Sequence, residues 1–159
     1  VIKMKLRMLA VGTRMPDWVE TGCNEYGKRM PPELCIQLIE IPLGSRGKSQ
    51  SNIKAIESEG QALLKAIGKR DFVIALHVLG KTMSTETLAT QLSHWQMDGR
   101  DVSLLIGGPD GLSESCMARA DMRWSLSDLT LPHPLMRIVL MEQLYRAWTI
   151  NANHPYHRC

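Results

Sequence analysis

Cysteine is scarce in this sequence and shows no arrangement that indicates metal or redox chemistry. The 159 residues include only four cysteines, and none forms a C-x-x-C pair or another spacing typical of metal ligands. The cysteine spacing therefore gives no reason to expect a bound metal. No apolar run approaches the ~20 residues of a membrane span, so no membrane partner is expected. Free thiols indicate a reducing compartment and a cytoplasmic protein; the four are Cys23, Cys35, Cys116 and Cys159.

Two phosphate-binding signatures and a strong charge bias are also missing. The chain has neither the G-x-G-x-x-G fingerprint of dinucleotide-binding folds nor a P-loop ending in G-K-S or G-K-T. Its formal net charge is +3 and its sequence pI is about 8.8, which permits a nucleic-acid partner without requiring one. The opening "VIKMKLRMLAV" lacks the cleavage region of a signal peptide, and its apolar residues predict a strand.

The chain does contain a regular alternation of strand-like and helix-like segments. With 44% hydrophobic and 22% charged residues it has the composition of a globular protein. The patterns predict strands at 5–11, 33–41, 72–78 and 101–108, a strand-to-loop segment at 124–131, and helices at 16–30, 52–67, 85–99, 113–122 and 134–151. This order predicts an α/β fold around a mainly parallel sheet. No repeat or linker divides the chain, so a single domain over 1–159 is expected.

The predicted helices carry further signals. Gly99 is a typical C-terminal stop, and Ser113 a typical N-cap. In the helix at 52–67, apolar residues recur with a spacing suited to one buried face: Ile53, Ile56, Leu63, Leu64 and Ile67.

A glycine turn, "LLIGGPDGL", follows the buried strand at 101–108. Ligands of open α/β sheets gather at the carboxyl ends of the strands, where Gly107 and Gly108 would let a ligand approach backbone amides. The alternative is an ordinary strand-to-helix turn, because short glycine motifs often occur without a ligand. Without a phosphate motif, a pocket for an uncharged group such as an adenine ring is favoured.

A second stretch, "SLSDLTLPHP" (125–134), places backbone amides among leucines. Such a loop suits an aromatic base that is hydrogen-bonded at its edge and packed on its faces. The alternative is a buried crossover, and His133 between two prolines is expected to be structural.

The last residues, "NANHPYHRC", are unusually rich in reactive side chains for a chain end. They include His154, Tyr156, His157 and Arg158. The H-x-x-H spacing offers only two metal ligands, so a catalytic or binding role is preferred to a metal site. Arg146 is a further candidate, with ion pairing to Glu142 one turn earlier as its alternative.

Four of these stretches together resemble one protein family. The segments "MKLRMLAVGTRMPDWV", "VSLLIGGPDGL", "SLSDLTLPHPLMRIVLMEQLYRAW" and "NHPYHR" occur in the same order as in that family. It is the group of bacterial large-subunit ribosomal RNA methyltransferases that modify N3 of a pseudouridine, within the SPOUT class. The resemblance runs from about Met4 to Arg158.

The resemblance implies a SPOUT-type α/β knot, in which residues from roughly 102 to 159 form a deep trefoil knot that binds S-adenosyl-L-methionine. It also implies a homodimer with the long C-terminal helix at the interface, and 23S ribosomal RNA of the assembled ribosome as substrate. Carried over by motif, the cofactor-binding residues are Leu76, Gly107, Gly108, Ser127, Asp128, Leu129, Thr130, Leu131 and Pro132. The chain departs from the pattern at His77, where relatives often carry an acidic residue.

The implied reaction removes the N3 proton of an imide, a weak acid, while a methyl group is aligned with that nitrogen. His154 or His157 is the candidate base, and the residue type alone does not choose between them. Arg158 is expected to offset negative charge or hold a phosphate, and Tyr156 to stack on a base. Arg146 is expected to contact a phosphate or a carbonyl.

A basic segment, "GSRGKSQSNIK", supplies Arg46, Lys48 and Lys54 as candidate contacts for RNA phosphates. A solvated loop without RNA contacts is the alternative. Two other functions stay open for the whole chain: a non-catalytic ribosome-binding or assembly module, and a small nucleotide-binding enzyme acting on a metabolite.

Overall fold

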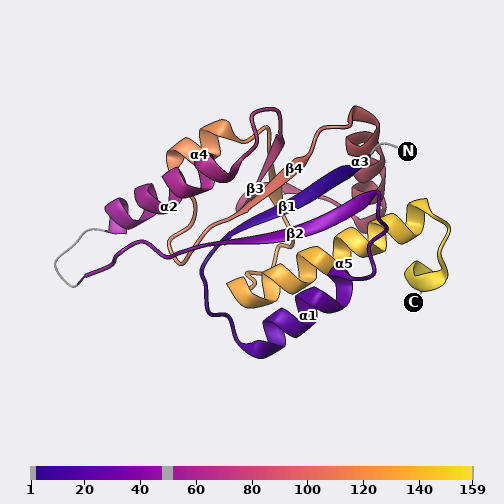
Figure 1. Ribbon diagram of the computed structural model, residues 1–159, viewed down its shortest axis with the longest axis horizontal. Helices are drawn as coiled ribbons and strands as arrows, with labels where there is room; N and C mark the ends of the chain where they lie inside the picture. Colours follow the sequence, from indigo (N-terminus) through magenta and orange to yellow (C-terminus); the bar gives the residue numbers. More distant parts are fainter. Residues whose placement is uncertain (1–2, 48–51, 159) are drawn as a thin grey trace.

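A parallel sheet of five strands forms the centre of the computed structural model, which describes residues 3–47 and 52–158. Lys48 and Cys159, which carry two of the sequence predictions, lie outside these ranges. The strands are β1 (Met4–Val11), β2 (Leu34–Ile41), β3 (Phe72–Thr82), β4 (Val102–Ile106) and β5 (Met122–Ser125). They follow the order β2-β1-β4-β3-β5, and every neighbouring pair is parallel (Figure 1).

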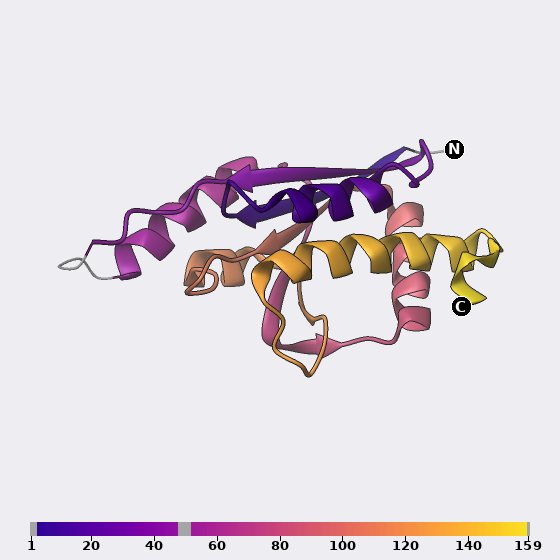
Figure 2. The same cartoon turned by 90° about the horizontal axis from the view of Figure 1, so that it is seen from below.

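Helices cover both faces of the sheet. They are α1 (Asp17–Gly27), α2 (Asn52–Ala66), α3 (Thr85–Asp98), α4 (Glu114–Arg119) and α5 (His133–Asn151), followed by a short 3-10 helix, η1 (Pro155–Arg158). Figures 1 and 2 show α1 beside α5 on one face, with α2 and α4 together near the other end of the sheet. These observations confirm the predicted α/β fold.

Strand β1 shows how the sequence divides the core between the two faces. Leu6 and Met8 belong to the hydrophobic cluster that packs with α1, α3 and α5, whereas Leu9 and Val11 pack with α2 and α4. This division follows from side chains that alternate between the two faces of a strand. Strand β4, in the middle of the sheet, is buried at every position, as expected for a parallel strand covered on both faces.

Strand β3 is longer than the sequence pattern predicts, and the helix predicted at 113–122 is shorter, because β5 already begins at Met122. Strand β3 was expected to end at residue 78, but it continues to Thr82 after a break in its pairing with β5. Both Leu76 and Lys81 pair with Trp124, so residues 77–80 bulge out of the sheet. Gly80 allows β3 to approach β5 again after the bulge, because a Cβ at this position would lie 2.7 Å from the Trp124 backbone nitrogen.

The buried face predicted for the helix at 52–67 is confirmed at Leu63, Leu64 and Ile67, which pack in the core, but not at the start of the helix. Ile53 is 65% exposed, whereas Glu59 is only 2% exposed. The helix buries Ala55, Glu59, Gly60 and Leu63. Apolar spacing alone did not reveal the whole of this face, because a carboxylate with partners from other segments occupies part of it.

The helix ends follow their sequence signals. Gly99 ends α3 with a φ of 83°, and the Ser113 hydroxyl accepts a hydrogen bond from the Cys116 backbone N–H at the start of α4. Cys23, Cys35 and Cys116 are free thiols, as expected. The trefoil knot stays a prediction, since strand order alone does not define how the chain is threaded. Across the described ranges, no helix is long and apolar enough to cross a membrane.

One charged residue, Arg137 on α5, is completely buried at the carboxyl ends of the strands. Its guanidinium pairs with Glu40 of β2 (Nη1 to Oε2, 2.8 Å) and donates to the carbonyl of Gly12 after β1 (2.7 Å). Its Nε donates to Nε2 of His133, 2.9 Å away, and the opposite ring nitrogen of His133 lies 3.0 Å from the Gly107 carbonyl. Arg137 therefore joins α5 to the ends of β1 and β2 and, through His133, to the turn after β4.

This network also sets the protonation state of His133. Because Nε2 accepts from Arg137, Nδ1 carries the proton and donates to Gly107. Burial lowers the pKa of His133 below its usual value, and the nearby Arg137 charge lowers it further. The imidazole is therefore neutral in the folded protein.

Replacing Arg137 should destabilise the fold strongly. Arg137→Met is expected to lower the free energy of unfolding by about 3 kcal/mol, because Glu40, His133 and the Gly12 carbonyl lose their common donor. Urea denaturation measures the loss. The exposed Arg70 offers a matched control, and Arg70→Met should stay within about 0.5 kcal/mol of the parent. Equal losses for the two variants would contradict the role of Arg137.

Stability should also decline as the pH falls through the range in which free histidine titrates. The folded-state pKa of His133 is lowered, so the unfolded chain takes up its proton first, below about pH 6.5. The His133 contribution is therefore complete above about pH 6.5 and is lost progressively below it. Urea midpoints at several pH values should show a steeper acid decline for the parent than for His133→Gln. Parallel pH profiles would refute the assignment.

Candidate functional site

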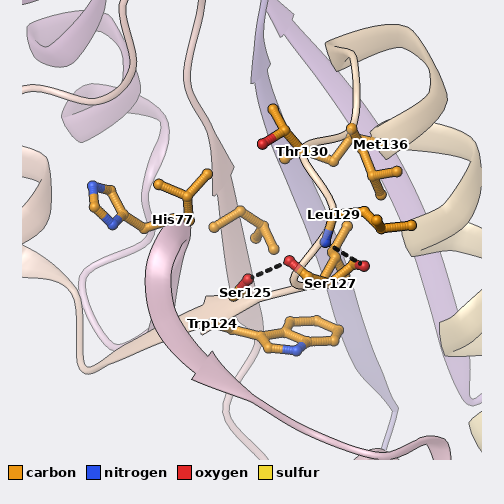
Figure 3. A pocket seen from close by; sticks show the side chains of 11 residues that line it. His77, Trp124, Ser125, Ser127, Leu129, Thr130 and Met136 are labelled. Atoms are coloured by element: carbon orange, nitrogen blue, oxygen red, sulfur yellow. Dashed lines mark hydrogen bonds between the residues drawn. The ribbon is translucent and has the colours of Figure 1, made fainter.

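Two adjoining cavities lie where β3 begins to bulge, at Leu76–Val78, and at the carboxyl end of β4. The larger has a volume of about 360 Å³ and is bounded by the glycine turn, a size within the range of small-molecule sites. The smaller lies between the end of β5 and the loop that leads to α5 (Figure 3). Both cavities are lined by Leu76, His77, Val78, Leu131 and Met136, so they form one continuous depression.

The glycine turn is built around a β-turn over residues 108–111. The Gly108 carbonyl accepts a hydrogen bond of 3.0 Å from the Gly111 N–H. A Cβ on Gly107 would lie 2.6 Å from the Gly111 carbonyl carbon, and one on Gly108 would lie 2.9 Å from Cγ1 of Val11. The absent side chains thus allow the turn to close and pack on the sheet. Gly107 and Gly108 also line the larger cavity. The two glycines are therefore compatible with both interpretations, a sterically required turn and a ligand site.

The loop that precedes α5 is folded by its own hydrogen bonds. The Ser125 hydroxyl donates to the Ser127 carbonyl (2.9 Å), and the Leu129 N–H donates to the Ser127 hydroxyl (3.0 Å; Figure 3). Of the predicted cofactor residues in this loop, Ser127, Leu129, Thr130 and Leu131 line the cavities. Asp128 and Pro132 are exposed and belong to neither lining.

The lining has no charged group suited to a phosphate. Among the described residues that form the two cavities there is no lysine, arginine, aspartate or glutamate. His133 lines the larger cavity, and the same burial that lowers its pKa keeps it neutral. Leucine side chains and backbone of the glycine turn fit the flat, uncharged adenine of S-adenosylmethionine better than a nucleotide phosphate.

The bulge at 77–80 forms another wall of the cavities, which the sequence did not reveal. The Leu79 N–H donates to Nδ1 of His77 over 3.1 Å, and Figure 3 shows the imidazole pointing away from the Ser127–Thr130 loop. The His77 imidazole therefore helps to hold the backbone of the bulge through this bond. Val78 and Met136 are lining residues that the motif comparison missed.

The C-terminal tail, residues 152–158, folds back on α5. The Tyr156 hydroxyl donates to Oε2 of Glu142 (3.1 Å), and its ring lies 4.7 Å from that of Tyr145. The Arg146 guanidinium lies 4.8 Å from the Tyr156 ring centre and also bonds both oxygens of Glu142 at 3.2 Å, which confirms the alternative ion pair. Burial, with Glu142 beside it, raises the pKa of Tyr156 to about 12. Tyr156 is thus an anchor of the tail and stays protonated.

The other tail residues differ in their surroundings. His154 is exposed and accepts the Tyr156 N–H at Nδ1 (3.2 Å). Nδ1 of His157 is buried, with no hydrogen-bond partner in the part of the chain that the structure describes. Arg158 is exposed. A polar hollow beside His157 is lined by Arg146, Gln143 and Thr85.

The tail and the cavities lie at opposite ends of α5. Met136 lines the cavities, whereas the tail begins after Asn151. At ~1.5 Å per residue, this stretch of helix is about 22 Å long. Figure 2 shows η1 at the far end of α5 from the loop that enters the helix. The structure thus does not bring the predicted tail residues together with the predicted cofactor residues of the same chain.

The candidate RNA contacts are placed differently from one another. Lys54 is exposed on α2. Arg46 instead pairs with Glu59 (Nη1 to Oε2, 2.6 Å) and Asp110 (Nε to Oδ2, 3.0 Å). Within the described ranges, no three His, Cys, Asp or Glu residues gather in a way that could hold a metal ion.

Comparison with known proteins gives concordant results. A family described as "Predicted SPOUT methyltransferase" matches residues 4–157. A protein of Saccharophagus degradans named "Ribosomal RNA large subunit methyltransferase H" is 60% identical over 155 residues, which cover 98% of this chain and 100% of that protein. A protein of the same name from a Marinomonas species is 56% identical over the same shares of both chains.

A solved structure supports the fold alone. A probable methylase family protein from Haemophilus influenzae superimposes with a TM-score of 0.56 at 11% identity, over 98% of this chain and 71% of that one. The near full-length relatives, the matching family and the cavity at the glycine turn agree with one another. The chain therefore belongs to the SPOUT methyltransferases and, among them, to the ribosomal RNA large subunit methyltransferase H family.

Proposed function

We propose that this enzyme methylates N3 of a pseudouridine in 23S ribosomal RNA, on the assembled ribosome in the cytoplasm. Two relatives that match nearly the whole chain carry the name of a large-subunit ribosomal RNA methyltransferase. The observation that carries the proposal is the uncharged cavity at the glycine turn, whose leucines and backbone groups suit the adenine end of the methyl donor.

The predicted cofactor residues make different kinds of contact with S-adenosyl-L-methionine, which supplies an activated methyl group when bound. Leu76 and Leu131 offer apolar surfaces, and Gly107 and Gly108 bring their backbone to the cavity. The loop of Ser127–Pro132, with Leu129 and Thr130 in the lining and Asp128 on the exposed part, excludes water from one side. Alignment of donor and acceptor in such a site accounts for much of the rate.

The tail supplies the groups that act on the N3 proton. His154 and His157 are candidates to accept it, and Arg158 is the candidate to offset negative charge that develops on the imide. Tyr156, held by Glu142 and Arg146, fixes the tail on α5. Arg146 thus acts through the position of Tyr156, and a direct contact with RNA is not needed to explain its place.

A homodimer resolves the separation between the tail and the cavities. Because about 22 Å of α5 lies between them within one chain, we infer that the tail of one subunit serves the cavity of its partner. Lys48 and Lys54 remain candidate phosphate contacts, and ribosome shape supplies the rest of the recognition. Neither a membrane nor a metal ion takes part in this proposal.

The direct test is methyl transfer to ribosomes that lack the modification. Purified protein and S-adenosyl-L-methionine should add one methyl group to a pseudouridine of 23S RNA, located by mass spectrometry of RNA fragments. Arg70→Gln, at an exposed site away from the cavities, serves as a control and should retain this activity. Cofactor and ribosome binding without any transfer would instead favour the non-catalytic assembly module.

Mixed dimers test whether the tail works across subunits. Deletion of residues 154–159 and Leu131→Trp, which fills the cavity, should each abolish transfer on their own. Leu131 is preferred to Gly108 for this purpose, because a side chain at Gly108 meets Val11. Dimers that combine the two variants should regain one working site, measured as methyl transfer after subunit exchange. Failure to regain activity, with heterodimers verified by mass spectrometry, would place the tail in its own subunit's site.

A further inference from the structure

Arg46 joins three segments that meet behind the glycine turn. Its Nη1 and Nη2 bind the two carboxylate oxygens of Glu59 at 2.6 and 3.2 Å, and its Nε binds Oδ2 of Asp110 at 3.0 Å. Nη1 also donates to the Gly44 carbonyl at 3.2 Å. These contacts link the segment after β2, helix α2 and the tip of the turn.

Glu59 keeps Arg46 in this position. The Glu59 side chain is 2% exposed, and it also accepts a hydrogen bond from the Gly44 N–H, at 2.9 Å. A buried carboxylate that loses its cation is left with an unbalanced charge, which is strongly unfavourable. Arg46 therefore cannot turn outward to a phosphate without leaving Glu59 unpaired, and most of its guanidinium donors are already engaged.

Both carboxylates that hold Arg46 also border the glycine turn. Asp110 is part of the β-turn over 108–111, and Oε1 of Glu59 lies 3.3 Å from the position of a Cβ on Gly108. Gly107 and Gly108 of the same turn line the larger cavity. A shift of Asp110 or Glu59 is thus transmitted to the backbone that lines the cavity.

We propose that Arg46 is a positioning residue for the cofactor, which it serves by fixing the glycine turn through Asp110 and Glu59, and that it is not an RNA contact. This inference rests on the proposed function, since it takes the cavity to be the S-adenosylmethionine site. It assigns the basic segment two separate roles, in which Lys54 faces solvent and Arg46 faces inward.

The test separates cofactor affinity from ribosome affinity. Titration calorimetry of the intact protein with S-adenosylmethionine should show a Kd raised about tenfold by Arg46→Gln and also by Asp110→Ala. The KM for ribosomes should stay unchanged in both. Lys54→Gln is the matched control: it should leave the cofactor Kd at the parent value and raise the ribosome KM.

Two further variants sharpen the outcome. Arg46→Lys keeps the charge but not the fork that reaches two carboxylates, so it should bind the cofactor less tightly than the parent. The double variant Arg46→Gln with Asp110→Ala should be no weaker than the worse single variant, because both break the same link. Asp110 is partly exposed, so Asp110→Ala tests the link even if Arg46→Gln unfolds the protein.

The possible failures point to different errors. A parent protein that does not bind S-adenosylmethionine would refute the proposed function itself. Tight cofactor binding by the parent, Asp110→Ala and Arg46→Lys alike would overturn the positioning role while the proposed function stands. A raised ribosome KM for Arg46→Gln, fully restored by lysine, would return Arg46 to the RNA-binding surface.

Discussion

The buried guanidinium of Arg137 is the constraint on which the ligand-binding end of the sheet depends. It is fully buried and contacts Glu40, Gly12 and His133 at once, from three different parts of the chain. A buried charge is tolerated only when its partners are all in place. The ends of β1 and β2 and the start of α5 must therefore assemble together, and His133 extends the same network to the turn after β4.

The glycine turn has few side chains of its own, and residues from other segments hold its backbone in position. At its start, the neutral His133 imidazole lies 3.0 Å from the Gly107 carbonyl. At its tip, Asp110 forms an ion pair with Arg46, which also pairs with the buried Glu59. A backbone held from two sides is a suitable wall for a ligand, because its amide groups are oriented before the ligand arrives.

Helix α5 runs from the cavities at its first turn to the C-terminal tail after its last turn. Its first turn carries His133 and Met136, which line the cavities, and its second half carries Tyr145, whose ring packs against Tyr156. Tyr156 and Arg146 hold the tail on α5 through Glu142 and the Tyr156 ring, so the proposed reaction assigns substrate contact to His154, His157 and Arg158. The spacing along α5 within one chain is the observation behind the proposal that the tail of one subunit serves the cavity of its partner.

Local patterns in the sequence were sufficient to determine the alternation of strands and helices, the caps at Ser113 and Gly99, and the position of the glycine turn. They succeeded because each depends on neighbouring residues. The bulge at 77–80 and the inward orientation of Arg46 depend on partners from other elements: Trp124, Glu59 and Asp110. Only the tertiary structure decided these features, because a buried charge or a close backbone contact is defined by segments that the sequence does not place side by side.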